Sequence, residues 1–517
     1  MAQTEGSEAW VDAWAEATPV NCGARMAEYI TSVGMEVHAE LLTNSKMFCR
    51  CEVGFGGMPN TRVCPICIGL PGTLPVPNRA AVEMVIKTAL ALNCTVPVDS
   101  VFHRKNYFYP DLPKGYQVSQ YGETNPIGYN GYLEIPDGKG GTKKIHIRRV
   151  HLEEDTGKLM HLPGGGSGVD YNRAGVPLME IVTEFPPDIE GPEDARNYLV
   201  QLRALLLYLG VCDGKLEQGS MRCEPNISVR LVGSGTYGTK TEIKNLNSFK
   251  TVQMGIEFEG KRQAEVIESG GTVVQETRGW NEATNTTFSM RVKESEADYR
   301  YFPCPDLIPM EFAREYVESI RATLPELPLA KLNRYLKDFG LSEYDAGVLV
   351  SEQYWAEFFE ECVAQGADPK LACNWMNGDF ARLLNESGQV GLVSADEYDG
   401  KPASKIRPRH LVELIKMIGE GTISGKIAKT VFEEMFVSGE SAAAIVEAKG
   451  LTVINDDSAL VAIINQVLDG NAGQVQQYKE GKESLIGFFV GQVMKNSGGR
   501  ADPQKVQQLL RDALGQR

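Results

Sequence analysis

The sequence lacks a long hydrophobic run and an excess of basic residues. No stretch of about 18 consecutive apolar residues occurs, so we expect no transmembrane helix and no membrane partner. Aspartate and glutamate number 68 and lysine and arginine 52, which leaves a formal net charge of −16. That balance argues against a protein whose main activity is unspecific binding to DNA or RNA, although it does not exclude a local basic patch.

The N-terminus also lacks the features of a targeting signal. Residues 1–20 contain four acidic residues and no lysine or arginine. A secretory signal begins basic and becomes apolar, and a transit peptide is rich in arginine. We therefore interpret residues 1–29 as an acidic leader. The eleven cysteines are an odd number, so they cannot all pair with each other, and they indicate reduced thiols in a cytoplasmic protein.

Hydrophobic patterning divides the rest of the chain into two kinds of region. From 30 to 310, alternating apolar residues predict strands, and apolar residues at helical spacing predict a few helices. The clearest strands are 33–41, 143–155, 175–185 and 220–233, and the clearest helices are 79–93 and 193–210. We therefore predict an α+β fold in which a large, mostly antiparallel sheet occupies 30–310.

Helical patterns dominate after Pro309. The candidate helices are 344–366, 369–387, 408–421 and 423–439. We predict an all-α helical domain at 311–439 and a small helical tail domain at 440–517. A chain of 517 residues has room for these parts, since a domain usually takes about 100–200 residues.

Four cysteines form the most specific local motif. Twelve residues separate the pair Cys49 and Cys51 from the pair Cys64 and Cys67. Two close pairs joined by a loop supply four thiolates for one tetrahedral Zn²⁺, in a closed structural site. Proline and glycine around the second pair indicate a turn, which favours zinc over the alternative of four reduced core cysteines.

Acidic residues and one histidine form a second candidate site. Glu36 and His38 lie two apart on a predicted strand, so both side chains leave the same face. Glu180 lies within an apolar run, where a carboxylate is costly to bury unless it is paired or bound to metal. Another predicted strand ends in Glu153, Glu154 and Asp155. Converging carboxylates with one imidazole would suit Mg²⁺ and phosphate oxygens. The alternatives are a salt-bridged Glu180 and an ordinary core His38.

Residues 103–121 combine cations with aromatic rings. The cations are His103, Arg104, Lys105 and Lys114, and the rings are Tyr107, Phe108, Tyr109, Tyr116 and Tyr121. This combination suits a nucleotide or the 3′ end of an RNA, while a packed proline-containing loop is the alternative. The glycine-rich segment 164–168 is interpreted as a flexible loop, because neither a phosphate-loop sequence nor an activated serine accompanies it.

The C-terminal tail differs in charge from the rest of the chain. Residues 471–517 contain seven basic and four acidic residues, so 7 − 4 gives +3 in an otherwise acidic protein. A solvated helical face is one interpretation. Contact with RNA is the other. The candidate contacts are Lys479, Lys482, Lys495, Arg500 and Lys505.

Longer blocks of sequence resemble one family, the B subunit of the glutamyl/aspartyl-tRNA(Gln/Asn) amidotransferase. The blocks, which occur in this order between about 33 and 307, are GMEVHAEL, CPICIGLPGTLP, RKNYFYPDLPKGYQVSQY, HLEEDTGK, DYNRAGVPLMEIVTE, GSMRCEPNISVR, KTEIKNLNSF and ESEADYRYFPCPDL. The segment NWMNGDFARLLNE in the helical half is similar to the same family. The sequence departs from the family pattern at 55–60, where FGGMPN replaces FGAEPN, and at 183–188, where the turn is one residue longer.

The resemblance implies an ATP-dependent carbon–nitrogen ligase that takes its amide nitrogen from glutamine. The side-chain carboxylate of Glu-tRNA(Gln) or Asp-tRNA(Asn) would be phosphorylated by ATP with Mg²⁺. Ammonia from an amidase, the A subunit, would then displace the phosphate, and a small C subunit would complete a heterotrimer. The sheet region would form the cradle that holds the tRNA 3′ end. A tRNA-binding scaffold without catalytic activity is the alternative.

The resemblance also implies roles for individual residues. Glu36, His38, Glu154 and Glu180 match the family's catalytic blocks, with His38, Glu154 and Glu180 as Mg²⁺ ligands. The four cysteines match the family's zinc knuckle. In addition to the residues that the resemblance gives, we expect Lys105 to contact phosphate or the aminoacyl carboxylate as a point charge, and Arg104 and Tyr107 to contact ATP or substrate.

Overall fold

The computed structural model describes residues 28–122, 125–292, 296–392, 397–398, 400–454 and 456–516. Of the predicted acidic leader, residues 1–27 lie outside the described residues. Among the helices that are described, none is both long and apolar enough to cross a membrane.

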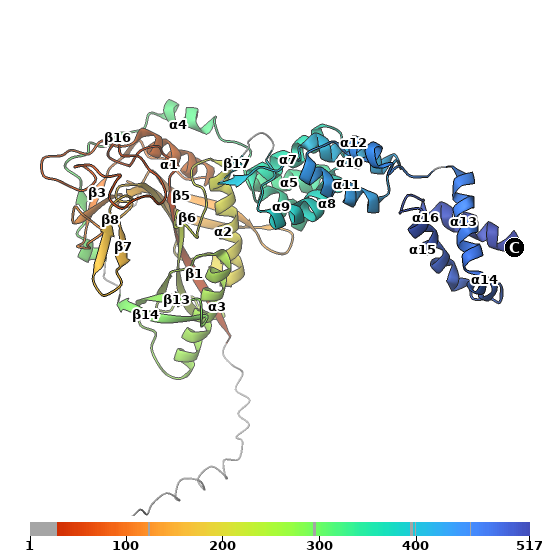
Figure 1. Cartoon of the computed structure of the whole chain (residues 1–517). Helices are drawn as coiled ribbons and strands as arrows, with labels where there is room; N and C mark the ends of the chain where they lie inside the picture. Colours follow the sequence, from red (N-terminus) through yellow and green to blue (C-terminus); the bar gives the residue numbers. More distant parts are fainter. Residues whose placement is uncertain are drawn as a thin grey trace, which may run out of the picture.

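A large sheet dominates the N-terminal half (Figure 1). Its strand order is β14-β13-β12-β11-β1-β9-β6-β5, and the short β10 also pairs with β1. The strands are β1 (Tyr29–Glu40), β5 (Gly128–Pro136), β6 (Thr142–Glu154), β9 (Pro177–Thr183), β10 (Ile189–Glu190), β11 (Met221–Leu231), β12 (Thr241–Lys244), β13 (Glu276–Asn281) and β14 (Thr286–Val292). Neighbouring strands are antiparallel except for β12 and β13, which run parallel. The predicted large, mostly antiparallel sheet is therefore confirmed.

Three helices pack against the sheet: α1 (Arg79–Ala91), α2 (Gly191–Tyr208) and α3 (Phe249–Glu268). β1 shows why one face is covered and the other is polar. Its residues Met35, Val37 and Ala39 are buried in the core with these helices. The alternating residues Glu36 and His38 point to the opposite face, because successive side chains of a strand alternate.

Smaller elements lie beside this polar face. A three-stranded sheet consists of β15 (Phe302–Pro303), β3 (His103–Asn106) and β4 (Tyr116–Ser119), and a hairpin consists of β7 (Lys158–His161) and β8 (Ser167–Asp170). A short ladder joins β2 (Asp99–Ser100) to β16 (Met310–Glu311). A long loop at 42–78 carries the cysteine motif. Residues 103–121 thus contain two short strands.

The middle of the chain is helical and has its own core. It contains α5 (Pro328–Phe339), α6 (Glu343–Val350), α7 (Gln353–Ala364), α8 (Pro369–Trp375), the π-helical turn η2 (Met376–Phe380), α9 (Ala381–Ser387), α10 (Pro408–Gly419), α11 (Gly425–Ser438) and α12 (Ala442–Lys449), with a small β17 (Glu397–Tyr398) and β18 (Lys401–Pro402) pair. The preceding helix α4 (Arg314–Arg321) packs on α1 instead, and its Val317 belongs to the core of the sheet region. The core of the helical middle region includes Ala442, Ile445 and Val446, so α12 packs with the preceding helices. We therefore propose to move the boundary of the tail domain from 440 to the segment after α12.

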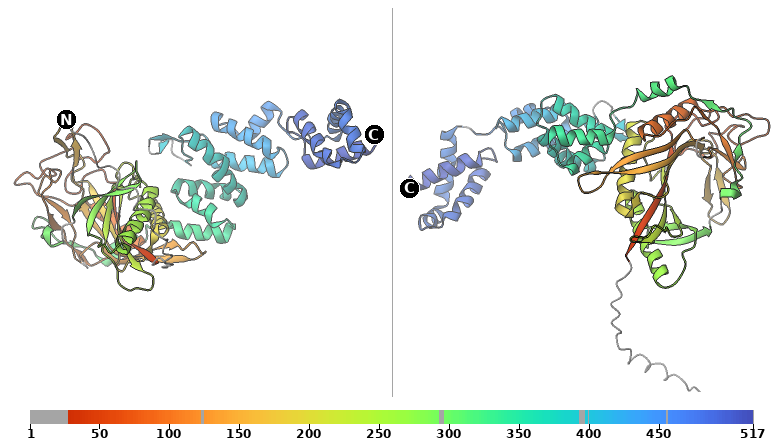
Figure 2. Two further views of the ribbon diagram at one scale, coloured as in Figure 1. Left: turned by 90° about the horizontal axis from the view of Figure 1, so that it is seen from below. Right: turned by 180° about the vertical axis from the view of Figure 1, so that it is seen from behind.

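The last helices enclose a third core. They are α13 (Asp457–Gly470), α14 (Ala472–Lys479), the 3₁₀ turn η3 (Glu483–Leu485), α15 (Ile486–Asn496) and α16 (Pro503–Gln516). Leu460, Phe489 and Leu510 are among the buried residues of this cluster. The views in Figure 2 show the sheet at one end, the middle helices next to it and the last helices at the other end. The predicted α+β fold with a helical C-terminal part is confirmed.

Candidate active site

The centre of the sheet places three ionisable side chains in one row across the strands. His38 on β1 pairs with Glu180 on β9, and Glu180 pairs in turn with His151 on β6. Directly opposed residues on neighbouring strands project to the same face, here the face opposite the helices. Strand pairing alone therefore brings together residues that lie more than a hundred positions apart in the sequence.

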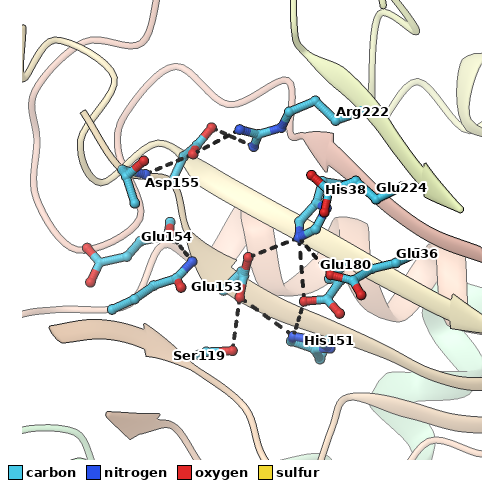
Figure 3. A network of polar contacts seen from close by, with 12 residues as sticks. Glu36, His38, Ser119, His151, Glu153, Glu154, Asp155, Glu180, Arg222 and Glu224 are labelled. Atoms are coloured by element: carbon cyan, nitrogen blue, oxygen red, sulfur yellow. Dashed lines mark hydrogen bonds and ion pairs between the residues drawn. The ribbon is translucent and has the colours of Figure 1, made fainter. Parts of the chain in front are cut away.

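The carboxylate and imidazole groups of these side chains point toward one another (Figure 3). His38 Nε2 lies 3.5 Å from Glu180 Oε2, 3.6 Å from Glu153 Oε1 and 3.8 Å from Glu36 Oε1. His151 Nε2 lies 3.1 Å from the same Glu180 oxygen and 3.7 Å from Glu153 Oε2. We call these five residues, Glu36, His38, His151, Glu153 and Glu180, the acidic cluster.

The structure places Glu154 outside the acidic cluster. Its carboxylate accepts hydrogen bonds from the Lys114 ammonium and from the Val118 amide, and it lines a different cavity of about 220 Å³. Adjacent residues of a strand face opposite sides, so Glu153 faces the cluster when Glu154 does not. The predicted ligand set His38, Glu154 and Glu180 is thus not brought together, and the Glu153 carboxylate lies beside His38 where Glu154 was expected. The structure brings together the other predicted residues, Glu36, His38 and Glu180.

His151 was missed by the sequence reasoning, although it lies in the block HLEEDTGK. The available signal was its spacing, since His151 and Glu153 lie two apart and share a strand face. Ser119 Oγ donates a hydrogen bond of 3.0 Å to Glu153 Oε2 and fixes that carboxylate. On the other side of the row, an Arg149 guanidinium nitrogen lies 3.9 Å from Glu180 Oε1.

Burial and the charges of neighbouring groups shift the pKa values of the cluster residues. Burial and the charge of Glu180 raise the pKa of Glu36 to about 7. Burial by itself would lower the pKa of His38, but the hydrogen bond and charge of Glu180 raise it to about 9. For Glu180, burial is outweighed by the two imidazoles, which hold its pKa well below the ordinary value.

Further ion pairs border the cluster on the neighbouring strand β11. Lys244 Nζ lies 2.6 Å from Glu224 Oε2, and nearby positive charges, that of Lys244 first, outweigh burial and lower the pKa of Glu224 to about 2. Arg222 lies 2.8 Å from Asp155 Oδ2, and despite burial it contributes to a pKa of about 2 for that carboxyl group. Glu224 and Asp155 thus pair with lysine and arginine, whereas the nearest basic groups of the acidic cluster are its own two imidazoles.

The acidic cluster has the geometry of a site for divalent cations. Two overlapping triads, Glu36–His38–Glu180 and His151–Glu153–Glu180, each offer ligand atoms that lie within 4.8 Å of one another. Their carboxylate oxygens suit Mg²⁺, which usually also takes ligands from water and substrate phosphates. The raised pKa of Glu36 fits such an ion, because an added positive charge would favour the ionised carboxylate.

Of the three predicted substrate contacts, the structure brings Lys105 close to the cluster. Burial opposes the charge of Lys105, but Tyr301, Glu153 and Glu180 raise its pKa above the ordinary value. Its Nζ lies 5.0 Å from the ring centre of Tyr299. Arg104 points to the other side of β3, where it pairs with Asp306 and lies over the Tyr116 ring at 4.2 Å.

Four tyrosine rings lie near Lys105. Tyr107 lies edge-on to Tyr299 at 5.9 Å between ring centres, and Tyr121 stacks on Tyr301 at 4.3 Å. Tyr299 and Tyr301 were missed as site residues, although both lie in the block ESEADYRYFPCPDL. Their distance of almost 200 positions from β3 hides this contact from local sequence patterns.

The four predicted zinc ligands converge in the loop before α1. The Sγ atoms of Cys49, Cys51, Cys64 and Cys67 all lie within 4.8 Å of one another. A tetrahedral Zn²⁺ with Zn–S bonds of about 2.3 Å requires sulfur atoms about 3.8 Å apart, so the quartet fits that ion. A hydrogen bond from Cys49, acting against burial, lowers the pKa of Cys67 to about 4. None of the ten cysteines in the described part of the chain forms a disulfide.

The predicted tail contacts divide into two groups. Lys479, Lys482 and Lys495 are exposed on the last helices. Arg500 is half-buried and donates hydrogen bonds to the carbonyls of Ser497 and Gly450. Lys505 is half-buried and pairs with Asp457.

The sequence of this sheet and of the helices after it matches a known class of catalytic protein. Residues 31–318 match the family model described as the GatB/GatE catalytic domain, and residues 357–514 match the one described as the GatB domain. The chain belongs to the family of aspartyl/glutamyl-tRNA(Asn/Gln) amidotransferase B subunits.

Its relatives, which carry that family name, are similar over nearly their whole length. The B subunit of Caldanaerobacter subterraneus subsp. tengcongensis is 54% identical over 487 residues, which are 94% of this chain and 99% of the relative. That of Thermodesulfovibrio yellowstonii is 52% identical over 484 residues, 93% of this chain and 98% of the relative. That of Geobacter sulfurreducens is 50% identical over 490 residues, 94% of this chain and 99% of the relative.

Proposed function

We propose that the chain is the part of a glutamine-dependent tRNA amidotransferase that activates the misacylated tRNA. The side-chain carboxylate of Glu-tRNA(Gln) or Asp-tRNA(Asn) would take the γ-phosphoryl group of ATP, and ammonia would then displace phosphate to leave the amide. Activation is needed because a free carboxylate is a poor electrophile. Family membership supports this function, and the acidic cluster is the observation that carries it.

The proposal assigns Mg²⁺ binding to the acidic cluster. Glu36, His38 and Glu180 would hold one side of the site, and Glu153 and His151 the other, with Glu180 shared between them. When bound, Mg²⁺ would offset the negative charge that gathers on the phosphoryl oxygens during transfer. Ser119 keeps Glu153 oriented through its hydrogen bond.

Lys105 is the proposed contact for phosphate or for the substrate carboxylate. Its ammonium is a compact charge that can follow the moving phosphoryl group. The Tyr299 ring next to Lys105 restricts the position of this long side chain. Tyr107 would border the same space.

The proposal includes partners and a second metal. An amidase, the A subunit, would supply ammonia, and a small C subunit would complete the heterotrimer, as the family resemblance implies. The cysteine quartet would bind one structural Zn²⁺. The exposed lysines of the tail would contact the tRNA.

The decisive experiment compares Glu153→Gln with Glu154→Gln in the reconstituted complex. The two carboxylates are adjacent in the sequence and both buried, but the structure assigns only Glu153 to the cluster. We measure ATP hydrolysis that depends on Glu-tRNA(Gln), and separately on Asp-tRNA(Asn). Glu153→Gln should reduce kcat by at least about 100-fold, the usual scale for losing one group that stabilises charge in the transition state. Glu154→Gln should reduce it less than about 10-fold, since the Glu154 carboxylate pairs with Lys114 and the Val118 amide instead of His38.

Equal activity of Glu153→Gln and the unaltered complex would contradict the assignment of the site. Loss of activity in Glu154→Gln alone, in a variant that keeps its circular dichroism spectrum and its zinc, would restore the original prediction. If neither tRNA stimulated ATP hydrolysis in the unaltered complex, the proposed reaction itself would be wrong.

A further inference from the structure

Lys46 is a fully buried lysine next to the cysteine quartet. Its relative exposure is 0%. Its Nζ donates a hydrogen bond to the Tyr171 carbonyl at 3.1 Å and lies 3.7 Å from Cys67 Sγ. Within the described residues, no carboxylate oxygen lies within 4.0 Å of this ammonium. A buried ammonium is unfavourable unless a negative charge compensates it. The Glu154 carboxylate lines the same cavity, but the group within hydrogen-bonding distance of the Lys46 ammonium that can carry such a charge is the Cys67 sulfur.

The charge of a zinc tetrathiolate fits this requirement. Zn²⁺ with four thiolates carries a net charge of −2, whereas four neutral thiols carry none. A cation at hydrogen-bonding distance from one sulfur would remove part of that excess. Groups that contact metal ligands in this way commonly orient them and tune the affinity for the metal.

We propose that Lys46 is the outer-sphere partner of the zinc site, which neutralises the Cys67 thiolate and fixes the site to the Tyr171 carbonyl. This proposal rests on the proposed binding of zinc by the quartet. Lys46 is a positioning residue, because it acts on the metal through Cys67 and does not contact substrate.

Backbone hydrogen bonds join the cysteine loop to the segment of chain that precedes β9. The Lys46 amide donates to the Cys51 carbonyl at 2.9 Å, and the next amide, that of Met47, donates to the Gly175 carbonyl at 2.7 Å. The Gly175 amide in turn donates to the Asp155 carbonyl at 2.9 Å. Lys46 therefore lies where the cysteine loop meets the segment 171–176, which leads into β9 and Glu180.

Gly175 shows how closely the two segments approach. Its φ is +85°, and a Cβ atom at this position would lie 3.5 Å from Cys67 Cβ and 3.6 Å from Lys46 Cδ. The stem of Lys46 is thus packed against the backbone of the 171–176 segment. A shorter or uncharged side chain at 46 would leave either a gap or an uncompensated thiolate.

The test measures zinc binding by the full-length chain, with no assay of activity. The variants are Lys46→Met, which keeps the stem and removes the charge, and Lys46→Arg, which keeps the charge. Arg50→Met is the matched control, since Arg50 lies between two of the cysteines but is exposed. Zinc content is determined by mass spectrometry, zinc affinity by competition with a coloured chelator, and the ligand set by the absorption spectrum of the Co²⁺-substituted protein.

We expect Lys46→Met to lower zinc affinity about 10–100-fold, the usual effect of losing an outer-sphere partner. Lys46→Arg should recover most of this loss, and Arg50→Met should show little change. In a Cys67→Ser background, Lys46→Met should have a much smaller effect, because its partner is absent. If Lys46→Met does not fold, Lys46→Gln is measured in its place, with the same expectation.

Unchanged affinity in Lys46→Met, or an equal loss in Arg50→Met, would overturn the role of Lys46. An additive effect of Lys46→Met and Cys67→Ser would do the same. These results are distinct from failure of the zinc proposal, which would show as an unaltered chain that is folded and contains no zinc.

Discussion

Glu259 on α3 is a buried carboxylate with a complete set of partners. It is 0% exposed and accepts hydrogen bonds from Thr241, Gln263 and Arg262, the last through two nitrogens at 2.6 and 2.8 Å. Arg278 Nε lies 3.5 Å from its second oxygen. These partners connect α3 to the outer strands of the sheet. Glu259 therefore stabilises the fold and is remote from the chemistry.

Replacing Glu259 by glutamine should destabilise α3 and the neighbouring strands. The glutamine side chain would place an N–H group against groups that donate hydrogen bonds to Glu259. Arg262 and Arg278 would also lose the carboxylate that they share. Removing one partner of a buried ion pair costs about 3 kcal/mol or more. Native-state hydrogen exchange of amides in α3 and β12 measures this free energy of opening. Glu257→Gln is the matched control on the same helix, since this exposed residue forms a surface pair with Lys261 and should change the value by less than about 0.5 kcal/mol.

The stabilisation by Glu259 should depend on pH in a defined direction. Burial raises the pKa of this carboxyl group, but Arg262, Gln263 and Thr241 lower it further, so the folded value lies below the ordinary 4.5. The stabilisation is therefore complete above the unfolded pKa and disappears as the pH falls through the folded value. The difference between the unaltered chain and Glu259→Gln should shrink below about pH 4.3. A difference that stays constant down to about pH 2 would contradict the ionised state of Glu259.

Much of the acidic cluster was predictable at the residue scale. Spacing by two placed Glu36 and His38 on one face, and an isolated carboxylate in an apolar strand indicated Glu180. The choice between Glu153 and Glu154 depends on a bulge in β6 between Ile147 and Arg149, because alternation counted from the start of the strand would place Glu154 on the face of His38. A bulge exchanges the faces of all later residues, and its mark in the sequence is the shift of the apolar residues from Ile145 and Ile147 to Val150 and Leu152.

At the scale of elements, β5 packs unusually close to the end of α1. A Cβ atom on Gly131 would lie 2.3 Å from Cys94 Sγ and 2.5 Å from the Leu92 carbonyl oxygen. One on Gly128 would lie 2.5 Å from Ala89 Cβ. The edge strand of the sheet can contact the helix in this way only because glycine occupies both positions.

Gly131→Ala should therefore move β5 away from α1. The resulting overpacking should cost about 1–3 kcal/mol, measured by hydrogen exchange of the amides shared by β5 and β6. Gly34→Ala on β1 is the matched control, because its Cβ would meet nothing closer than Asn226 Cβ at 3.8 Å. Gly34→Ala should leave stability unchanged or slightly higher. Equal effects of the two substitutions would show that close approach does not explain the glycine at 131.

Long, strongly periodic elements were predicted better than short ones. The predicted strand 33–41 and helix 79–93 correspond to β1 and α1 within a few residues. The predicted helix 344–366 is divided in the structure, since α6 ends at Val350 and α7 begins at Gln353. Its apolar spacing continues across the break, so periodicity could not detect it. The strands β3 and β4 are four residues each, too short for a pattern, and depend on pairing with distant segments.

At the scale of the whole molecule, the negative charge is unevenly distributed. Carboxylates of the acidic cluster and its neighbours lie at the centre of the sheet, while the last helices carry the basic residues of the tail. The views in Figures 1 and 2 place these two parts at opposite ends of the described chain. An acidic protein can therefore present a local basic surface to RNA without unspecific attraction along its whole length.

The side-chain contacts of the tail sharpen the prediction of which residues bind tRNA. Arg500 and Lys505 have partners in the helical half of the chain, so their loss would also disturb its fold. Lys479 and Lys495 are exposed at the ends of α14 and α15, where a cation also interacts well with the helix dipole. We expect these two exposed lysines to contribute to phosphate contacts with little structural cost on removal.

Replacing Lys479 and Lys495 together by glutamine should weaken tRNA binding by the complex mainly at low salt. Each lost phosphate contact should reduce the slope of log K against log salt concentration by about 0.7–0.9. Binding of Glu-tRNA(Gln) is measured between about 50 and 200 mM salt, a range over which the Debye length falls by roughly half and electrostatic contacts separate from others. Lys261→Gln on α3 is the control, since this lysine is exposed but lies on the sheet body. An unchanged slope in the double variant would show that the tail lysines are a solvated face, because only phosphate contact couples their charge to counterion release. An equal decrease with Lys261→Gln would show that the effect is not specific to the tail.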